Sequence, residues 1–281
     1  MDNTKLKQNI INLEEVAKSG ESKLFKSLPK FLLRKIIKII HQDKYNEIHS
    51  KYWNIVGLGY VEGLIKEFGL KFKIIGFEKI PKDGRFVYVA NHPQGGLDAI
   101  SFLYLIHQHH GDVVSPSNEV FEFIPNLSPF IIGVNVFGHN TKEKAKAVND
   151  AFAGNRPIMI FPAGEVSRKG KNGIIEDTEW YKTFVTKSIE HKRTIVPVFI
   201  TGRNSEKFYR ISRIRKFFGI KAYIETLYLP DEMVKQFNSE ITFIAGEPIP
   251  YDKLDKSISH SDWAVKIRNI VYNLGKTIKL K

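Results

Sequence analysis

The chain has 281 residues, of which 42% are hydrophobic and 12% aromatic, a composition that suits a globular protein with a sizeable core. Its 43 Lys and Arg residues outnumber its 30 Asp and Glu residues. The formal net charge is therefore +13, and we expect an anionic partner: nucleic acid, an anionic membrane, or an acidic substrate or carrier. The absence of cysteine excludes disulfides, thiolate metal sites and an acyl-cysteine intermediate.

The sequence contains no candidate for a membrane-spanning or secretory segment. No apolar stretch approaches the roughly 18 uninterrupted residues that a bilayer requires, and residues 1–8 lack the apolar centre of a signal peptide. We therefore expect a cytoplasmic protein that is either soluble or bound to a membrane surface.

Residues 1–70 are predicted to form an N-terminal helical extension. A polar amphipathic run reaches Lys18, a basic amphipathic segment follows, and residues 52–68 place large apolar side chains on one helical face. Pro29 either bends the basic segment or marks the start of its helix. In that segment two sets of residues recur on opposite sides of a helical wheel: Lys23, Lys26, Lys30, Arg34 and Lys38 against Phe25, Leu28, Leu32, Ile36 and Ile39.

The basic segment has two interpretations. It could lie in a membrane interface, with its apolar face among acyl chains and each basic residue contributing about 1 kcal/mol near anionic headgroups. It could equally pack on the core as an ordinary helix with a solvated basic face. The sequence leaves both open.

Beyond residue 70, short β-branched or aromatic runs alternate with helical patterns. Strands are predicted at 72–75, 86–89, 112–114, 131–137, 158–161, 195–200, 223–229 and 241–245. Helices are predicted at 99–109, 141–153, 180–191 and 261–280. This order predicts an α/β fold in which a single mixed β-sheet is flanked by helices, within one domain that spans residues 71–281.

The most informative stretch is a turn at the exit of an apolar strand, where residues 89–100 read Val-Ala-Asn-His-Pro-Gln-Gly-Gly-Leu-Asp-Ala-Ile. A carboxylate such as Asp98 can fix the tautomer of His92 and stabilise the cation that forms when the imidazole takes a proton. Asn91, Gly95 and Gly96 shape the same turn. The alternative is that His92 merely caps the following helix and Asp98 is a solvated acid in its first turn.

Two further strands run into polar loops. The strand at 158–161 leads to Glu165, Ser167, Arg168 and Lys169, and the strand at 195–200 leads to a loop that begins with Arg203 and Asn204. Loops at strand ends form the binding crevice of an α/β sheet. The three cationic side chains are candidates to bind the anionic part of a substrate, although exposed basic residues are common in this chain.

The three blocks, in this order, resemble the glycerolipid acyltransferases typified by lysophosphatidic acid acyltransferase, and more closely their hemolysin-like bacterial branch, which acts on glycine or ornithine lipids. The resemblance runs over residues 72–250. His92 and Asp98 match the catalytic His-Asp pair of the family. Residues 161–165 match its Phe-Pro-Glu-Gly block, and residues 196–198 match its final block. The resemblance implies the glycerolipid acyltransferase fold.

Several positions depart from the common family pattern. Five residues separate His92 from Asp98 instead of four, as in the hemolysin-like branch. Ala163 stands where the family has Glu, and Glu165 lies two residues further on. His139 or Asn140 stands where the family has the Arg that binds the phosphate of the acceptor. These departures favour an acceptor with an amino-acid headgroup over one with glycerol phosphate, and the sequence leaves lysophosphatidic acid and a lyso-amino-acid lipid both open.

The function expected from these residues is transfer of a fatty acyl group from an acyl thioester to the hydroxyl of a lysolipid-type acceptor. His92 would be the general base and Asp98 would orient it, while backbone N–H groups of Gly95 and Gly96 could stabilise the oxyanion. The expected partners are acyl carrier protein or coenzyme A as thioester carrier, a lysolipid, and an anionic membrane at the inner face of the cell membrane. No cofactor and no metal are expected.

Two alternatives remain. A thioesterase or lipid hydrolase would use His92 to activate water. A non-enzymatic protein could bind nucleic acid or a membrane through residues 203–221, where basic and aromatic residues alternate; nucleic acid is the less favoured partner. His107, His109 and His110 close a predicted helix and are expected to be solvated.

Overall fold

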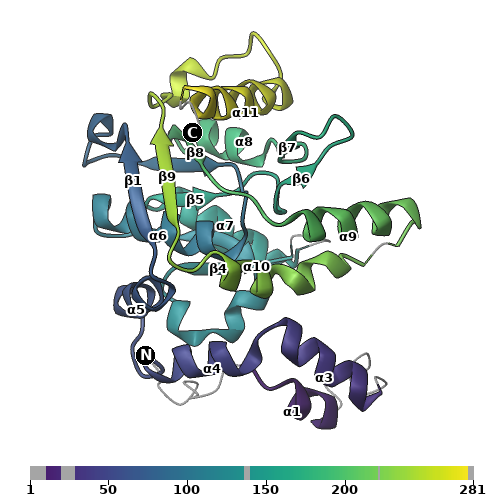
Figure 1. Cartoon of the computed structure of the whole chain (residues 1–281). Coiled ribbons are helices and arrows are strands. Elements are labelled where there is room, and N and C mark those ends of the chain that lie inside the picture. The colour runs from purple at the N-terminus through teal and green to yellow at the C-terminus, as the bar shows by residue number, and fades with distance from the viewer. Residues whose placement is uncertain (1–10, 20–28, 136–139, 221, 278–281) are drawn as a thin grey trace.

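A five-stranded mixed sheet forms the centre of the molecule. The computed structural model describes residues 11–19, 29–135, 140–220 and 222–277 (Figure 1). In spatial order the strands are β1 (Lys71–Ile75), β9 (Glu240–Ala245), β8 (Thr194–Ile200), β2 (Phe86–Ala90) and β5 (Ile158–Ile160). β1 is parallel to β9, β9 is antiparallel to β8, and β8, β2 and β5 are mutually parallel. The predicted α/β fold with a mixed, helix-flanked sheet is confirmed.

Helices cover both faces of this sheet, which explains why β2 is apolar at every position. Val87 and Val89 of β2 face one apolar cluster, and Tyr88 and Ala90 face the other. The helices α5 (Leu58–Phe68) and α6 (Gly96–His110) supply the second cluster. The first contains side chains of α7 (Lys142–Ala153), α8 (Thr183–Glu190) and α11 (His260–Lys276). All five residues of β2 are buried.

Two short strand pairs lie outside the central sheet. β3 (Ser115–Asn118) pairs in parallel with β4 (Ile131–Val134), and β6 (Arg168–Lys169) pairs with β7 (Ile175–Glu176) as an antiparallel hairpin. The strand predicted at 112–114 is therefore shifted toward the C-terminus, with Val114 forming only an isolated bridge to β5.

The strand predicted at 223–229 is wrong. The segment forms the 3-10 helix η5 (Ile224–Tyr228) and leads into the helix α10 (Leu229–Lys235). Pro230 lies in the first turn of α10 together with Asp231 and Glu232. Proline suits the first turn because backbone N–H groups there have no partner within the helix, so the N–H that proline lacks is not missed. Acidic residues suit it because they interact favourably with the helix dipole. The helix predicted at 52–68 also starts later, after Gly57, which has a φ of 80°.

The N-terminal helices are α1 (Leu13–Ser19), α3 (Lys30–Ile39) and α4 (Gln42–Ser50). Pro29 is the N-cap of α3, so of the two predicted roles it marks the start of a helix. No residue of α3 is fully buried, and Lys30, Arg34 and Lys38 are exposed. Of the predicted basic segment, Lys23, Phe25, Lys26 and Leu28 lie outside the described residues.

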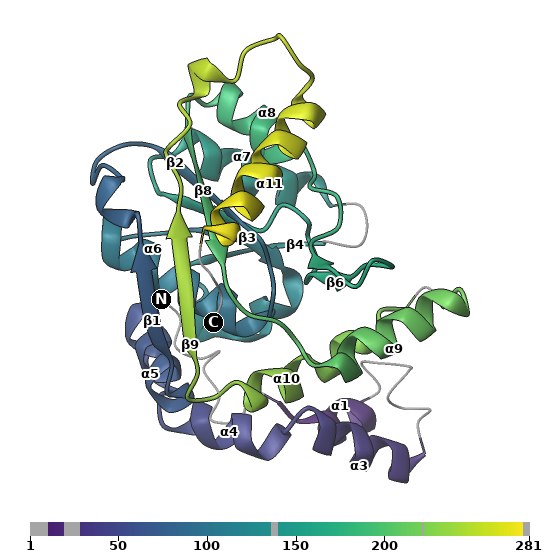
Figure 2. The same ribbon diagram turned by 45° about the horizontal axis from the view of Figure 1, so that its top comes forward.

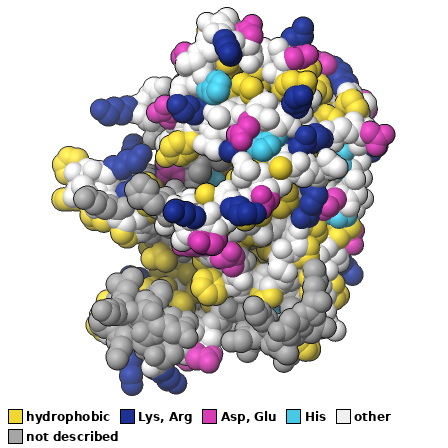
Figure 3. All heavy atoms as spheres, turned by 180° about the vertical axis from the view of Figure 1, so that it is seen from behind, with side chains coloured by type: hydrophobic (Ala, Val, Ile, Leu, Met, Phe, Trp, Pro, Cys, Tyr) yellow, Lys and Arg dark blue, Asp and Glu magenta, His cyan; other side chains and the backbone are white. Residues whose placement is uncertain are grey.

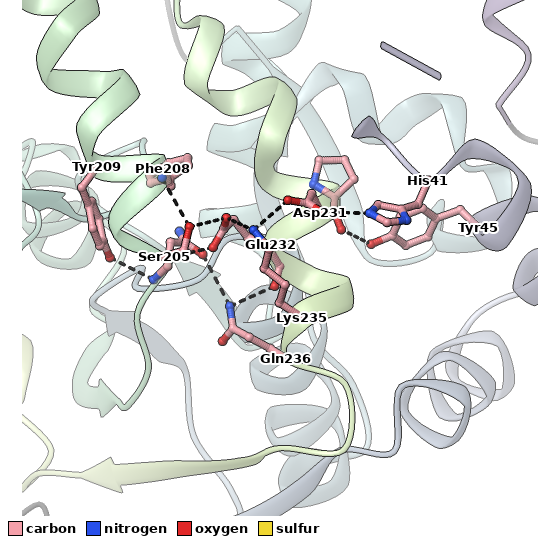
Figure 4. Close-up of polar contacts among 11 residues, drawn as sticks. His41, Tyr45, Ser205, Phe208, Tyr209, Asp231, Glu232, Lys235 and Gln236 are labelled. Atoms are coloured by element: carbon pink, nitrogen blue, oxygen red, sulfur yellow. Dashed lines mark hydrogen bonds and ion pairs between the residues drawn. The ribbon is translucent and has the colours of Figure 1, made fainter. Parts of the chain in front are cut away.

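The short helix α10 connects the N-terminal helices to α9 (Glu206–Phe217), as Figure 4 shows. On one side, His41 Nε2 lies 2.8 Å from Asp231 Oδ1, and Tyr45 Oη donates a hydrogen bond to a backbone carbonyl of α10. On the other side, the backbone N–H and the hydroxyl of Ser205 donate to the buried Glu232 carboxylate over 2.6 and 2.7 Å. In Figure 2, α9 and α3 project from the same side of the molecule. Within the described ranges, no helix has both the length and the apolarity that crossing a membrane demands.

Candidate active site

The candidate site lies at one edge of the sheet, where three parallel strands end together. β2 runs between β8 and β5, so the loops that follow them, which begin at Asn91, Phe161 and Thr201, leave from the same edge. Ligands bind outside the carboxyl ends of the strands in open α/β sheets. The three predicted motif loops therefore converge.

His92 and Asp98 face each other within the first of these loops. His92 Nδ1 lies 3.1 Å from Asp98 Oδ1, and the Asp98 side chain is completely buried at the N-terminus of α6. The other carboxylate oxygen, Oδ2, accepts a hydrogen bond from the backbone N–H of Gln94 over 2.8 Å. One oxygen of the Asp98 carboxylate is thus bonded to the backbone and the other lies beside His92 Nδ1, which leaves Nε2 of His92 for proton transfer.

The His92 ring stacks on Phe161, with 4.0 Å between ring centroids and 17° between planes. Phe161 is the first residue of the Phe-Pro-Ala-Gly loop that follows β5. The aromatic residue of one motif therefore sets the plane of the imidazole of another, while only 16% of the His92 side chain remains exposed.

A second buried carboxylate, Asp177, also holds the loop of residues 91–95 between β2 and α6, which we call the histidine loop. Its Oδ1 accepts hydrogen bonds from the His92 backbone N–H (3.1 Å) and the Ser167 hydroxyl (2.6 Å), and its Oδ2 accepts one from Trp180 Nε1 (2.9 Å). Asp177 was not among the site residues predicted from the sequence. It lies 85 residues from His92, and no motif spacing identifies it.

The two carboxylates also determine the proton affinity of His92. Burial of the imidazole acts to lower its pKa, but the negative charge of Asp98 and the smaller effect of Asp177 outweigh burial, so the pKa of His92 lies above its ordinary value. Burial raises the pKa of Asp177 in turn, against the effect of its hydrogen bonds with Ser167 and Trp180.

Asn91, Gly95 and Gly96 shape the histidine loop. The Asn91 side chain donates to the carbonyl of Ile200 (2.9 Å) and accepts from its N–H (2.7 Å), which ties the end of β2 to the end of β8. Gly95 has a φ of 94°, and a Cβ on Gly96 would lie 2.6 Å from the sulfur of Met233 in α10. Glycine at 96 therefore allows close packing of α10 against the start of α6.

Arg168 is buried among carboxylates. Its guanidinium lies 3.0 Å from Glu165 and 3.3 Å from Glu225, and Glu225 in turn lies 2.8 Å from Arg215. The Arg168 side chain is 6% exposed, and that of Glu225 is completely buried. Protein carboxylates therefore neutralise Arg168, while Glu165 also accepts a hydrogen bond from Thr178.

The remaining predicted binding residues surround the histidine loop. The Ser167 N–H donates to the carbonyl of His92 (2.8 Å), and Asn204 Nδ2 donates to the carbonyl of Pro93 (3.3 Å). Lys169 pairs with Glu206 at 2.8 Å, away from the histidine. Arg203 is exposed, and no ion pair joins it to the rest of the described chain. Ser167 and Asn204 thus hold the backbone of the loop, and Arg203 is the cation that remains accessible.

The position where the family has a phosphate-binding Arg is only partly described. Asn140 exchanges hydrogen bonds with the backbone of Asn135, over 2.7 and 3.2 Å, and closes its own loop. His139 lies outside the described residues.

The three histidines that end α6 are half-buried, and the prediction that they are solvated is wrong. His110 Nε2 lies 2.6 Å from the Tyr88 hydroxyl, and His109 Nε2 lies 3.0 Å from the carbonyl oxygen of Ile80. The His107 ring packs edge-on against Phe130. In the part of the chain that the structure describes, no three His, Asp or Glu side chains form a group that could hold a metal ion.

Comparison with known proteins gives consistent results. Residues 15–279 match the family described as Acyltransferase. Two curated proteins named lyso-glycine lipid O-acyltransferase, from Bacteroides thetaiotaomicron and Phocaeicola vulgatus, are 36% and 37% identical to this chain over 266 residues. Both alignments cover 94% of this chain, and they cover 97% and 95% of those proteins respectively. Among solved structures, the chain is similar to the 1-acyl-sn-glycerophosphate acyltransferase PlsC of Thermotoga maritima, with a TM-score of 0.46 and 15% identity over 89% of this chain and 95% of that one.

The match to the family covers nearly the whole chain, and both curated relatives align over almost their full length. The predicted family is thereby confirmed. The chain belongs to the acyltransferase family and is an enzyme that transfers acyl groups.

Proposed function

We propose that the enzyme transfers a fatty acyl group from an acyl thioester to the hydroxyl of a lyso-glycine lipid, with His92 as general base. The acceptor is proposed from the names of the two curated relatives and from the absence of an Arg at positions 139 and 140. The His92–Asp98 pair at 3.1 Å is the observation that carries the mechanism.

The geometry supports a direct transfer. With its Nδ1 proton directed at Asp98, neutral His92 presents the lone pair of Nε2 and takes the proton of the acceptor hydroxyl as that oxygen attacks the thioester carbonyl. The new C–O bond forms, the C–S bond breaks, and the leaving thiolate takes the proton back from the imidazolium. Asp98 stabilises the cation between these two proton transfers.

The carbonyl oxygen of the thioester becomes negative during the attack. The first turn of α6 begins at Gly96, and its unpaired backbone N–H groups together with the helix dipole favour negative charge there. We propose that this helix start stabilises the oxyanion and that Arg203, exposed at the same edge, attracts the anionic part of a substrate.

The proposed donor is the thioester of acyl carrier protein or coenzyme A, and the proposed working place is an anionic membrane surface. All of these are anionic, in keeping with the net charge of +13. The acceptor, a lipid with one acyl chain, resides in that surface.

The test is a transfer assay with purified enzyme. The wild type, given acyl carrier protein or coenzyme A thioester, is expected to acylate lyso-glycine lipid faster than lysophosphatidic acid, and to release little free fatty acid without acceptor. His92→Ala is expected to lower transfer by about 10²–10⁴-fold, with a circular dichroism spectrum and a melting temperature close to those of the wild type. Full activity in His92→Ala would overturn the mechanism. Rapid thioester hydrolysis without acceptor would identify a thioesterase instead.

A further inference from the structure

A group of large apolar side chains is exposed at the far end of α9. Their exposed fractions are 50% for Ile214, 84% for Phe217, 69% for Phe218 and 41% for Ile220. We call these four residues the α9 tip. The two phenylalanine rings pack edge to face, with 5.2 Å between their centroids. In Figure 3, which shows the molecule from behind, hydrophobic side chains gather on a projection at the left edge of this face.

Large apolar side chains are exposed at the α9 tip but not at the start of the helix. At the start of α9, Phe208 and Tyr209 are completely or almost completely buried against Val166. The helix then projects from the molecule in Figure 2, and its last residue Phe217 and its C-cap Phe218 are exposed. Contiguous exposed apolar surface of this kind marks an interaction site, because leaving it in water is unfavourable.

The charges beside the tip define the partner. Arg210, Arg213 and Lys216 are exposed on α9, and none of them has an ion-pair partner within the described ranges. The helix α3, which lies against η5 and projects from the same side, adds exposed Lys30 and Arg34. Aromatic and aliphatic residues flanked by unpaired cations fit an anionic bilayer, in which the apolar groups enter the acyl region and the cations meet the headgroups.

We propose that the α9 tip is a membrane-docking surface, which inserts into an anionic bilayer and brings the active-site edge to it. The proposal rests on the proposed function for the meaning of that edge, but the docking itself does not depend on it. A nucleic acid fits less well, because Ile214 and Ile220 offer bases no ring to stack on.

The tip is fastened to the active site by buried charges. Arg215 lies directly after Ile214 in the chain. Its side chain is only 7% exposed, and its Nε lies 2.8 Å from Glu225 Oε2. Glu225 lies 3.3 Å from Arg168, whose neighbour Ser167 donates to the carbonyl of His92. A bilayer that holds the tip therefore also holds the orientation of the histidine loop.

The experiment measures binding of the full chain to vesicles of phosphatidylcholine alone and of phosphatidylcholine with phosphatidylglycerol. The wild type is expected to bind the anionic vesicles more tightly. The double variant Phe217→Ser/Phe218→Ser is expected to bind them at least about tenfold more weakly, since two exposed aromatic side chains lose their burial in lipid. The triple variant Arg210→Gln/Arg213→Gln/Lys216→Gln is expected to lose the preference for anionic vesicles. Val265→Ser, at a residue of α11 that is 48% exposed, is the matched control and should bind like the wild type.

Enzyme activity separates docking from catalysis. With lyso-glycine lipid dispersed in detergent, both α9 variants are expected to retain activity within about twofold of the wild type, because the acceptor is not in a bilayer and docking is not needed. With the acceptor in anionic vesicles, the activity of the variants should fall in proportion to their vesicle binding. A double variant that binds anionic vesicles like the wild type overturns the proposal. A variant with a raised KM for acyl carrier protein and unchanged vesicle binding would also overturn it, because the tip would then bind the carrier. A wild-type dimer that the variant converts to monomers would overturn it as well, because the tip would then be a subunit interface. Vesicle binding that depends on the tip, in an enzyme inactive on dispersed acceptor, would uphold docking and refute the proposed function alone.

Discussion

His92 is held by two carboxylates that reach it from different directions. Asp98 faces its side-chain nitrogen, and Asp177 accepts a hydrogen bond from its backbone N–H. The first comes from the same loop, whereas the second comes from the segment after the β6–β7 hairpin. Both charges raise the pKa of the imidazole against the effect of burial.

Replacing Asp98 with Asn should change both the rate and its pH dependence. Without the carboxylate, burial dominates and the pKa of His92 falls. His92 then stays neutral to lower pH, so the acid limb of the kcat/KM profile should move to lower pH. The maximal rate should drop by about 10²–10⁴-fold because the imidazolium loses its counter-charge. The control is Asp150→Asn, at an exposed pair with Lys146, which should leave the profile unchanged. An unmoved acid limb would show that Asp98 does not act on the base.

Asp177 is a positioning residue, and Asp177→Asn should lower kcat more than it changes KM. An amide in place of Oδ2 would direct N–H groups at the Trp180 indole, which leaves a donor unpaired and costs about 1–3 kcal/mol of folding stability. The acid limb should move to lower pH, though less than in Asp98→Asn, since the charge of Asp177 raises the pKa of His92 less than the charge of Asp98 does. Trp180→Phe removes one donor but keeps the carboxylate, so it should lose stability without moving the limb. A shift of equal size in Trp180→Phe would reduce Asp177 to a purely structural residue.

Among the elements, the contact between α10 and α6 determines the shape of the histidine loop. A Cβ on Gly96 would lie 2.6 Å from the Met233 sulfur, and one on Gly95 would lie 3.3 Å from the Leu229 side chain. These glycines look like loop residues in the sequence, but they are needed where α10 packs on them; of α10, only Leu229 fell within the strand predicted at 223–229.

Gly96→Ala should destabilise the protein by about 1–3 kcal/mol, because the new methyl group would overlap the Met233 sulfur at 2.6 Å. Met233→Ala opens space at the same place, so the double variant should be more stable than the sum of the single effects by about 0.5–3 kcal/mol. Urea unfolding of the four proteins measures this coupling. Simple additivity would mean that the glycine is required for its backbone conformation alone.

At the scale of the whole molecule, buried charges connect segments that are far apart in the chain. Glu225 lies between Arg168, from the hairpin after β5, and Arg215, from the end of α9. α10 then joins this side of the molecule to the N-terminal helices through Asp231 and His41 (Figure 4).

Glu225→Ala should cost about 3–5 kcal/mol of the free energy of unfolding, because it leaves two buried guanidinium groups without their shared counter-charge. Asp150→Ala, which breaks an exposed pair with Lys146, should cost no more than about 0.5 kcal/mol. Denaturant unfolding compares the two. Equal costs would show that the buried carboxylate is not needed to neutralise Arg168 and Arg215.

Features that depend on residues close together in the chain could be predicted from the sequence. The strands and most helices follow from apolar periodicity, so the mixed sheet could be predicted. His92 and Asp98 lie in one turn, so their pairing could be predicted as well. Three parallel strands end at one edge, so their loops had to converge.

Features that depend on contacts between distant segments became visible only in the folded protein. Asp177 contacts His92 although the two residues are 85 positions apart in the chain. Arg168 was predicted from the sequence to bind an anion, but in the fold Glu165 and Glu225 neutralise its charge. The strand predicted at 223–229 gave way to helical turns that pack on α6 and α9. Burial and charge pairing are set by neighbours in space, and a linear pattern records only neighbours in the chain.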